Sequence, residues 1–283
     1  MRCFSPLFII LPILAALISS APGQEPASPP DTIPIMTVGG IIEEWRDPFD
    51  FFAHDHQTLY DLSERVRRAA ADEEVAGLLV RFEMPIWAPA QAMDFEQALR
   101  EFRASGKPLY ASFDFADMLT YLAASPANQI AAPPVGGVDL HGMGVSLYYF
   151  RTLLEKMGME VDVIATGPFK EALGPFTHDT MTSATEVQMT ALLDDLFTSI
   201  QSRVAGNRGL EEKRVRTIIT GGPYTSTTAA EAGAIDTVAY LDDYLGQIAD
   251  SFDQDVSFDE EYFDSDDEPV EKWYGIGVDG GHV

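Results

Sequence analysis

The sequence has almost no cysteine and few basic side chains. Its one cysteine is Cys3, and 18 lysine and arginine residues stand against 45 aspartate and glutamate residues, for a formal net charge of −27. A chain this acidic is poorly suited to bind nucleic acid or anionic lipid, because both carry the same sign of charge. If Cys3 leaves with an N-terminal signal, the mature protein can form no disulfide, thiolate nucleophile or cysteine-based metal site.

The sequence also lacks motifs that bind phosphate or metal, and it lacks the motif that carries the nucleophile of α/β-hydrolases. The pairs Gly39-Gly40 and Gly136-Gly137 lack the spacing and the following Lys-Ser/Thr of a phosphate-binding loop. His54 and His56 have no further ligands around them that would complete a metal site. The pair His178-Asp179 is more typical of a turn than of half a catalytic triad, and no Gly-x-Ser-x-Gly elbow occurs. We therefore predict no cofactor and no metal.

The N-terminus has the features of an export signal. Arg2 is followed by an apolar stretch over residues 4–18, and Ala21-Pro22-Gly23 provides small residues for cleavage. We predict a signal peptide over residues 1–23 and a proline-rich linker over residues 24–32. The alternative is an uncleaved membrane anchor, since the apolar stretch is about as long as the shortest spanning helices. Both readings place the protein in the periplasm or cell envelope, associated with the membrane at most through its N-terminus.

Short apolar runs alternate with helical periods from residue 33 to residue 249, which predicts an α/β domain with a parallel sheet and a more helical C-terminal part. The predicted helices include residues 147–157 and a long helix opened by a capping box, Ser183 to Glu186, and ended by Gly206. The acidic residues 250–283 are predicted to be a disordered tail. The predicted strands are residues 33–38, 75–82, 108–113, 128–132, 161–165 and 235–240.

Lys170 lies in an unusual setting among the five lysines. The others have polar neighbours, whereas Lys170 stands in a Gly/Pro/aromatic turn, residues 166–176, just after an apolar run. A lysine that loses its hydration favours the neutral amine, which is the form of a general base in a Ser-Lys hydrolase. The other reading is an ordinary loop lysine whose stem covers apolar surface.

Several collinear blocks between residues 33 and 243 resemble the protease IV (signal peptide peptidase A) family of Ser-Lys peptidases. The resemblance implies a crotonase/ClpP-like superfold with repeated ββα units. It is closest to the N-terminal half of the long, duplicated form, in which the lysine comes from this half and the serine from the other. The blocks are residues 98–111, 121–130, 138–142, 147–149, 167–172, 175–176 and 179–181.

The resemblance assigns the site residues unevenly. Lys170 matches the catalytic lysine and would be the general base, but Met118 stands where the family has its serine nucleophile. The glycine pair that forms the family's oxyanion hole would fall within residues 84–89, which read Met-Pro-Ile-Trp-Ala-Pro. Prolines and bulky side chains do not suit an exposed amide turn. Three other serines, Ser112, Ser125 and Ser146, are not at the matching position.

Three functions remain open at this stage. The chain can be a lysine-bearing half that hydrolyses peptides or signal peptides only beside a serine-bearing partner subunit or through self-association. It can also be a non-catalytic assembly or peptide-binding homologue that keeps Lys170 as a relic. A self-sufficient peptidase using one of the unaligned serines is the third reading.

Overall fold

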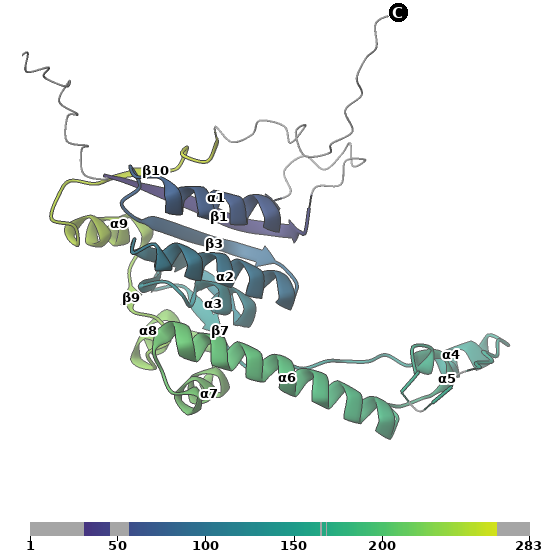
Figure 1. The fold of residues 1–283 in the computed structure, drawn as a ribbon. Helices are drawn as coiled ribbons and strands as arrows, with labels where there is room; N and C mark the ends of the chain where they lie inside the picture. The colour runs from purple at the N-terminus through teal and green to yellow at the C-terminus, as the bar shows by residue number, and fades with distance from the viewer. Residues whose placement is uncertain (1–30, 46–56, 165, 168, 265–283) are drawn as a thin grey trace, which may run out of the picture.

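The computed structural model describes residues 31–45, 57–164, 166–167 and 169–264, and its centre is a parallel sheet (Figure 1). The sheet has the order β10-β1-β3-β4-β6-β9, and β2 pairs with β1 outside this path. The predicted α/β class is therefore confirmed. The strands are β1 (Thr32–Glu43), β2 (Gln57–Thr58), β3 (Leu78–Ile86), β4 (Leu109–Phe113), β6 (Gln129–Ala132), β9 (Thr237–Val238) and β10 (Ser257–Asp259).

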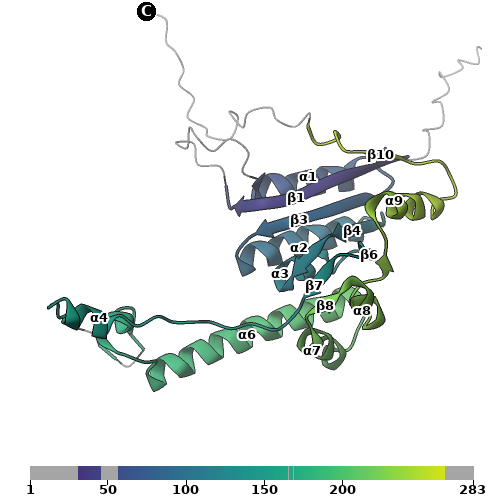
Figure 2. The same cartoon turned by 180° about the vertical axis from the view of Figure 1, so that it is seen from behind.

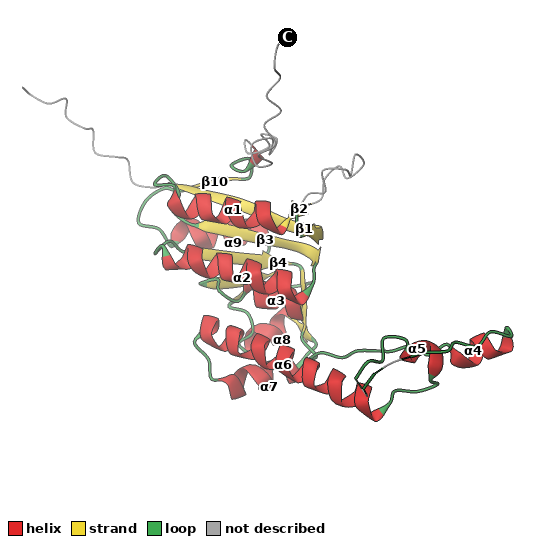
Figure 3. Cartoon of the chain, turned by 45° about the vertical axis from the view of Figure 1, so that its right-hand side comes forward, coloured by secondary structure: helices red, strands yellow, loops and turns green. Residues whose placement is uncertain are grey.

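Helices cover the two faces of this sheet unequally. Three helices, α1 (Leu59–Ala71), α2 (Pro89–Ala104) and α3 (Met118–Ala124), lie on one face, and α9 (Leu241–Asp250) lies on the other (Figure 3). The first face encloses the larger core, because α1 and α2 present their apolar stripes to β1, β3 and β4. The second face encloses a smaller cluster in which Tyr110 and Tyr244 meet edge to face.

A second, smaller layer packs beside the main sheet. It contains the three-stranded sheet β5-β7-β8, made of β5 (Phe115–Asp117), β7 (Gly137–Asp139) and β8 (Tyr224–Thr225). The helices α7 (Glu212–Gly221) and α8 (Ser226–Glu231) pack near it, together with the C-terminal half of α6 (Ser183–Arg208). The buried carboxylate of Glu96 joins α6 to α2, accepting from Arg203 at 2.5 Å and from Asn207 at 2.6 Å.

Residues 144–195 form an arm that projects from the core (Figures 1 and 2). The arm contains α4 (Arg151–Lys156), α5 (Gly174–Thr177) and the N-terminal half of α6. Among its described residues only Gly174 is buried. Polar contacts hold the tip together: Arg151 and Thr152 both donate to Asp179, and the rings of Phe150 and Phe176 stack.

The arm corrects three predictions. Residues 161–164, predicted as a buried strand, form no strand, because the arm has no sheet against which this apolar run could pair. The predicted helix over residues 147–157 is shortened to α4, which has no buried residue. The long helix is capped by Thr182 rather than Ser183, since Thr182 accepts from Thr185 N–H, and it ends at Gly209 in the left-handed conformation rather than at Gly206.

The predicted disordered tail is wrong over residues 250–264. Strand β10 pairs in parallel with β1, and the ring of Phe263 is 4% exposed within the larger core. The Tyr262 hydroxyl donates to Asp72 at 2.6 Å. Aromatic residues spaced among the carboxylates hold this segment on the sheet while the charges point outward. The predicted signal peptide, the predicted linker up to residue 30 and residues 265–283 lie outside the described residues.

Candidate functional site

Met118, which the resemblance predicts to occupy the position of the family's nucleophile, is the first residue of α3. Asp117 caps this helix by accepting from Thr120 N–H at 2.8 Å. The Met118 side chain is 6% exposed and belongs to the larger core. A thioether has no proton to lose and cannot form an acyl ester, so this helix terminus presents no nucleophile from residue 118.

The segment at the end of β3, where the family's glycine pair would fall, is strained. Glu83 pairs with Gly39 and Ile86 with Ile41, so three residue steps of β3 oppose two of β1 and β3 bulges. Met84, inside this bulge, has a φ of +49° and is the one non-glycine residue with positive φ in the described part of the chain. Such a conformation costs about 1–3 kcal/mol and concentrates at functional sites.

Few backbone amides remain free in this segment. Pro85 and Pro89 have no N–H, and Ala88 N–H donates to the Gln91 side chain at 2.7 Å. The bulge therefore has a glycine-like backbone conformation at Met84, but the prolines interrupt the series of amides that an oxyanion site would use.

An apolar groove of about 520 Å³ runs beside the bulge and the start of α3. Its rim includes Met84, Ile86 and Phe115, whose side chains are all more than half exposed. The floor comes from α3 and from the three-stranded sheet, through Thr120 and Val138. A concave apolar surface of this size suits the side chains of a peptide or another small apolar ligand.

Lys170 lies far from this groove, in the loop between α4 and α5 on the arm (Figure 1). Its side chain is exposed, and no ion pair or hydrogen bond of Lys170 is found among the described residues. No residue of the arm lines the groove. The structure thus separates Lys170 from Met118 within one chain.

The neighbouring carboxylate of Glu171 is held away from Lys170. It accepts hydrogen bonds from the hydroxyls of Thr185 and Thr182, and these bonds lower the pKa of Glu171. Thr182 is also the cap of α6, so Glu171 fixes the lysine loop to the start of that helix. The arrangement leaves the Lys170 ammonium available to a group outside the described chain.

Lys107 differs from its expected solvated state. It is partly buried and donates to the carbonyls of Ala69 and Asp72 at the end of α1. Burial lowers the pKa of Lys107, while Asp72 and Glu73 act in the opposite direction. Because its ammonium binds helix-end carbonyls, we assign Lys107 a structural role.

The other candidate residues do not form a dyad or a triad. Ser125 is fully buried, donating to Leu122 and accepting from Asn207, and Ser146 is exposed on the arm. His178 follows α5, and the adjacent carboxylate, Asp179, is bound by Arg151 and Thr152. Ser112 lines a separate pocket on the α9 face. His54 and His56 lie outside the described residues.

The described residues contain neither a metal-binding cluster nor a membrane-spanning helix. There, no three His, Cys, Asp or Glu side chains gather into a possible metal site. None of the helices in this part of the chain combines the length and apolar character needed to cross a bilayer.

Comparison with known proteins supports the resemblance. Residues 101–255, more than half of the chain, match Peptidase family S49. Protease 4 of Salmonella typhi is 31% identical over 159 residues, which are 56% of this chain and 26% of that protein. Protease 4 of Haemophilus influenzae is 23% identical over 220 residues, which are 74% of this chain and 36% of that protein. The chain thus spans about a quarter to a third of the length of these relatives.

Among solved structures, a mutant of the 1510-N membrane-bound stomatin-specific protease superposes with a TM-score of 0.48 at 12% identity. The alignment covers 81% of this chain and 97% of that one. The family match over residues 101–255 includes strands β4 to β9, the arm with Lys170, and α6 to α9. The chain belongs to peptidase family S49.

Proposed function

We propose that this chain supplies the general-base lysine of a Ser-Lys peptidase and hydrolyses peptide bonds only beside a serine-bearing half. The observation that carries the proposal is the position of Lys170, exposed on the arm and unpaired among the described residues. Family membership supports a peptidase function. The division of labour between two halves is our inference from the residues at the site.

The missing groups support a partner rather than a complete site. Met118 offers no nucleophile, and in the segment around Met84 two prolines lack an N–H and the Ala88 N–H is bound to Gln91. Because an acyl-transfer enzyme needs a nucleophile, a base and an oxyanion site in one place, Lys170 must act with groups from another chain. Contact with that chain would strip water from the ammonium and favour the neutral amine.

The surface of the arm supports the same reading. Apolar side chains are exposed along it, although large apolar residues in a monomer are normally covered. In α6, Val187 and Leu192 are exposed, while Ile200 and Val204 on the same helix are buried in the core. The exposed apolar residues on the arm include Tyr148, Leu153, Met157, Ile164, Phe169, Leu173 and Phe176. A partner half or a second copy of this chain would cover them.

A second function, peptide binding without hydrolysis, is favoured by the groove. Its apolar rim at Met84, Ile86 and Phe115 needs no catalytic group to hold an apolar peptide. In that case Lys170 would be a relic and the chain an assembly or binding subunit.

Reconstitution separates the two functions. Purified mature chain is incubated with an apolar peptide ester, alone and after mixing with a serine-bearing S49 protein encoded by the same genome. We expect no hydrolysis by the chain alone, co-purification of the two proteins, and hydrolysis by the mixture above that of the partner alone. Hydrolysis by the chain alone, abolished by Lys170→Ala, would show a self-sufficient peptidase. Co-purification without any gain in hydrolysis would favour the binding subunit.

A further inference from the structure

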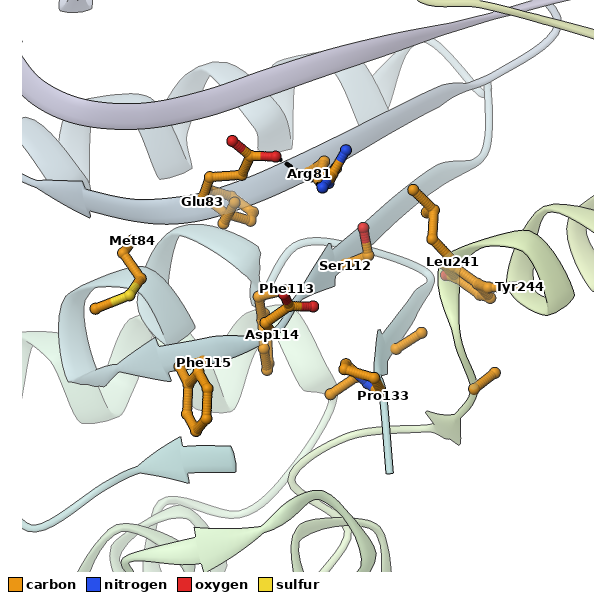
Figure 4. A pocket seen from close by; sticks show the side chains of 14 residues that line it. Arg81, Glu83, Met84, Ser112, Phe113, Asp114, Phe115, Pro133, Leu241 and Tyr244 are labelled. Carbon is orange, nitrogen blue, oxygen red and sulfur yellow. Dashed lines mark ion pairs between the residues drawn. The ribbon is translucent and has the colours of Figure 1, made fainter. Parts of the chain in front are cut away.

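A second pocket, of about 430 Å³, lies on the face of the main sheet that carries α9 (Figure 4). It opens at the carboxyl ends of β3, β4 and β6, and Leu241 and Tyr244 of α9 form one side. The carboxyl edge of a parallel sheet is where α/β proteins bind small ligands, and the volume lies within the usual range of about 300–1,000 Å³. The apolar groove described above shares Met84 and Phe115 with this pocket but contains neither Ser112 nor any residue of α9, so the two concavities adjoin along the end of β3 and the start of β5.

The pocket contains a buried hydroxyl that has no partner. Ser112 is 8% exposed, and its Oγ makes no hydrogen bond. In Figure 4 this hydroxyl rises from β4 toward the space between Arg81 and Leu241. A buried polar group without a hydrogen bond typically costs about 1–3 kcal/mol, and a ligand atom in the pocket would remove that cost.

Charged groups of both signs surround the hydroxyl. Arg81 is the direct register partner of Ser112 on β3, so the two side chains leave the same face of the sheet from backbones about 5 Å apart. One nitrogen of Arg81 binds Glu83 at 2.8 Å, and the guanidinium has further N–H donors beyond that pair. The carboxylate of Asp114 lies at the end of β4 on the same rim.

These groups define the chemistry of a ligand. Arg81 and the Ser112 hydroxyl together provide donors for a carboxylate. Two carboxylates against one guanidinium leave the rim with a net negative charge, which disfavours a simple anion and suits a molecule that also carries an ammonium group. Leu241, which is half-buried, gives this side of the pocket an apolar surface that suits an apolar side chain, and the fully buried Tyr244 behind it binds the Gln129 carbonyl through its hydroxyl.

We propose that this pocket binds a small zwitterion, a free α-amino acid with an apolar side chain. Its carboxylate lies on Arg81 and Ser112, and its ammonium lies toward Asp114. The proposal does not require peptide hydrolysis, because neither the arm nor α3 lines the pocket, and only Met84 and Phe115 border both this pocket and the apolar groove. It gives the chain a ligand site on the opposite face of the sheet from α3.

Titration calorimetry on the full mature chain tests the proposal with L-leucine as the probe. We expect a dissociation constant below ~10 mM, the range open to a small ligand held by a few polar contacts. Leucinamide, which lacks the carboxylate, and 4-methylpentanoate, which lacks the ammonium, should each bind about tenfold more weakly or not at all. No heat with L-leucine at that concentration would overturn the proposal. Equal binding of all three compounds would do the same, and tighter binding of the dipeptide Leu-Leu would replace the amino acid with a peptide end.

Single substitutions test whether L-leucine binds in this pocket. Ser112→Ala and Asp114→Asn should each weaken L-leucine about tenfold, the loss expected for a hydrogen bond to a charged group. The matched control is Ser226→Ala, because Ser226 is also a fully buried serine with an unpartnered hydroxyl but lies outside the pocket. Circular dichroism checks folding, and Asp114→Asn, a change at an exposed side chain, still tests the site if Ser112→Ala does not fold. Unchanged binding in Asp114→Asn and in every folded Ser112 variant would contradict the assignment.

Discussion

Removal of the Phe263 ring should destabilise the fold, although the residue lies in a segment whose composition predicts disorder. Phe263 is 4% exposed, packs edge to face with Tyr262 at 4.8 Å between ring centroids, and lies 5.9 Å from the Arg65 guanidinium. Deleting a buried phenylalanine side chain typically costs about 3–5 kcal/mol. For a folded unit of this size each kilocalorie shifts the melting temperature by about 2–4 °C. We therefore expect Phe263→Ala to lower it by about 6 °C or more.

The matched control is Phe169→Ala on the arm, where the ring is 56% exposed. Surface substitutions usually change stability by less than about 0.5 kcal/mol, so this control should melt within about 2 °C of the parent. Both variants are compared by thermal unfolding followed by circular dichroism. If Phe263→Ala melts with the control, then residues 260–264 do not anchor the tail and the packing of this segment is refuted.

Three further outcomes are expected. Hydrogen bonds from the Tyr262 hydroxyl and the Glu74 amide lower the pKa of Asp72, so Asp72→Asn should destabilise the chain at pH 7. In urea unfolding, the difference in unfolding free energy between this variant and the parent should shrink as the pH falls below 3.8, the ordinary pKa of Asp. A difference that stays constant with pH would contradict this. Glu96→Ala should cost about 1.5–3 kcal/mol in urea unfolding, because it removes the buried carboxylate that accepts from Arg203 and Asn207 at the base of α6. A loss under about 1 kcal/mol would show that the network does not hold the helix. Mass spectrometry of the exported protein should find a new N-terminus at about residue 24, whereas an intact Met1 on a protein that needs detergent would establish an anchor.

The sequence predicts the centre of the fold well, because its signals are local and agree with one another. The apolar runs that become β1, β3 and β4 are bounded by polar or glycine residues, and the spacing of Leu62, Val66 and Ala69 fixes the buried face of α1. Such patterns indicate which residues are buried. In the centre of this fold the buried apolar runs are also the strands that pair in the sheet, so the prediction from burial is correct there.

The same signals fail where an apolar residue has no partner in its own chain. Residues 161–164 have the composition of a strand but extend along the arm, since periodicity cannot tell a core neighbour from a missing one. The opposite error occurs at Phe263, where a high density of carboxylates obscures one aromatic anchor. A prediction of disorder depends on the average composition of a segment, whereas a single buried aromatic ring is enough to hold a short segment on the core.

The candidate site was predictable in its residue types and not in its geometry. The collinear blocks identified the family and the loop of Lys170, but nothing in them indicates that Glu171 is held by Thr182 and Thr185. The positive φ of Met84 has no sequence signature, because methionine is not a residue that favours it. The unpartnered hydroxyl of Ser112 likewise depends on which side chains three strands bring together.

The central claim is that Lys170 serves as a base in a site completed by another chain. Its most direct test is the rate of peptide-ester hydrolysis by the reconstituted complex with a serine-bearing S49 partner, measured with Lys170→Ala and with Lys156→Ala, a second exposed lysine on the arm. We expect the Lys170→Ala variant to assemble with the partner but to lower the hydrolysis rate by about a thousandfold or more, which is the usual scale for losing a catalytic base. The Lys156→Ala variant should hydrolyse the ester at the parent rate. Full hydrolysis by an assembled Lys170→Ala complex would contradict the account and leave the chain as a binding subunit.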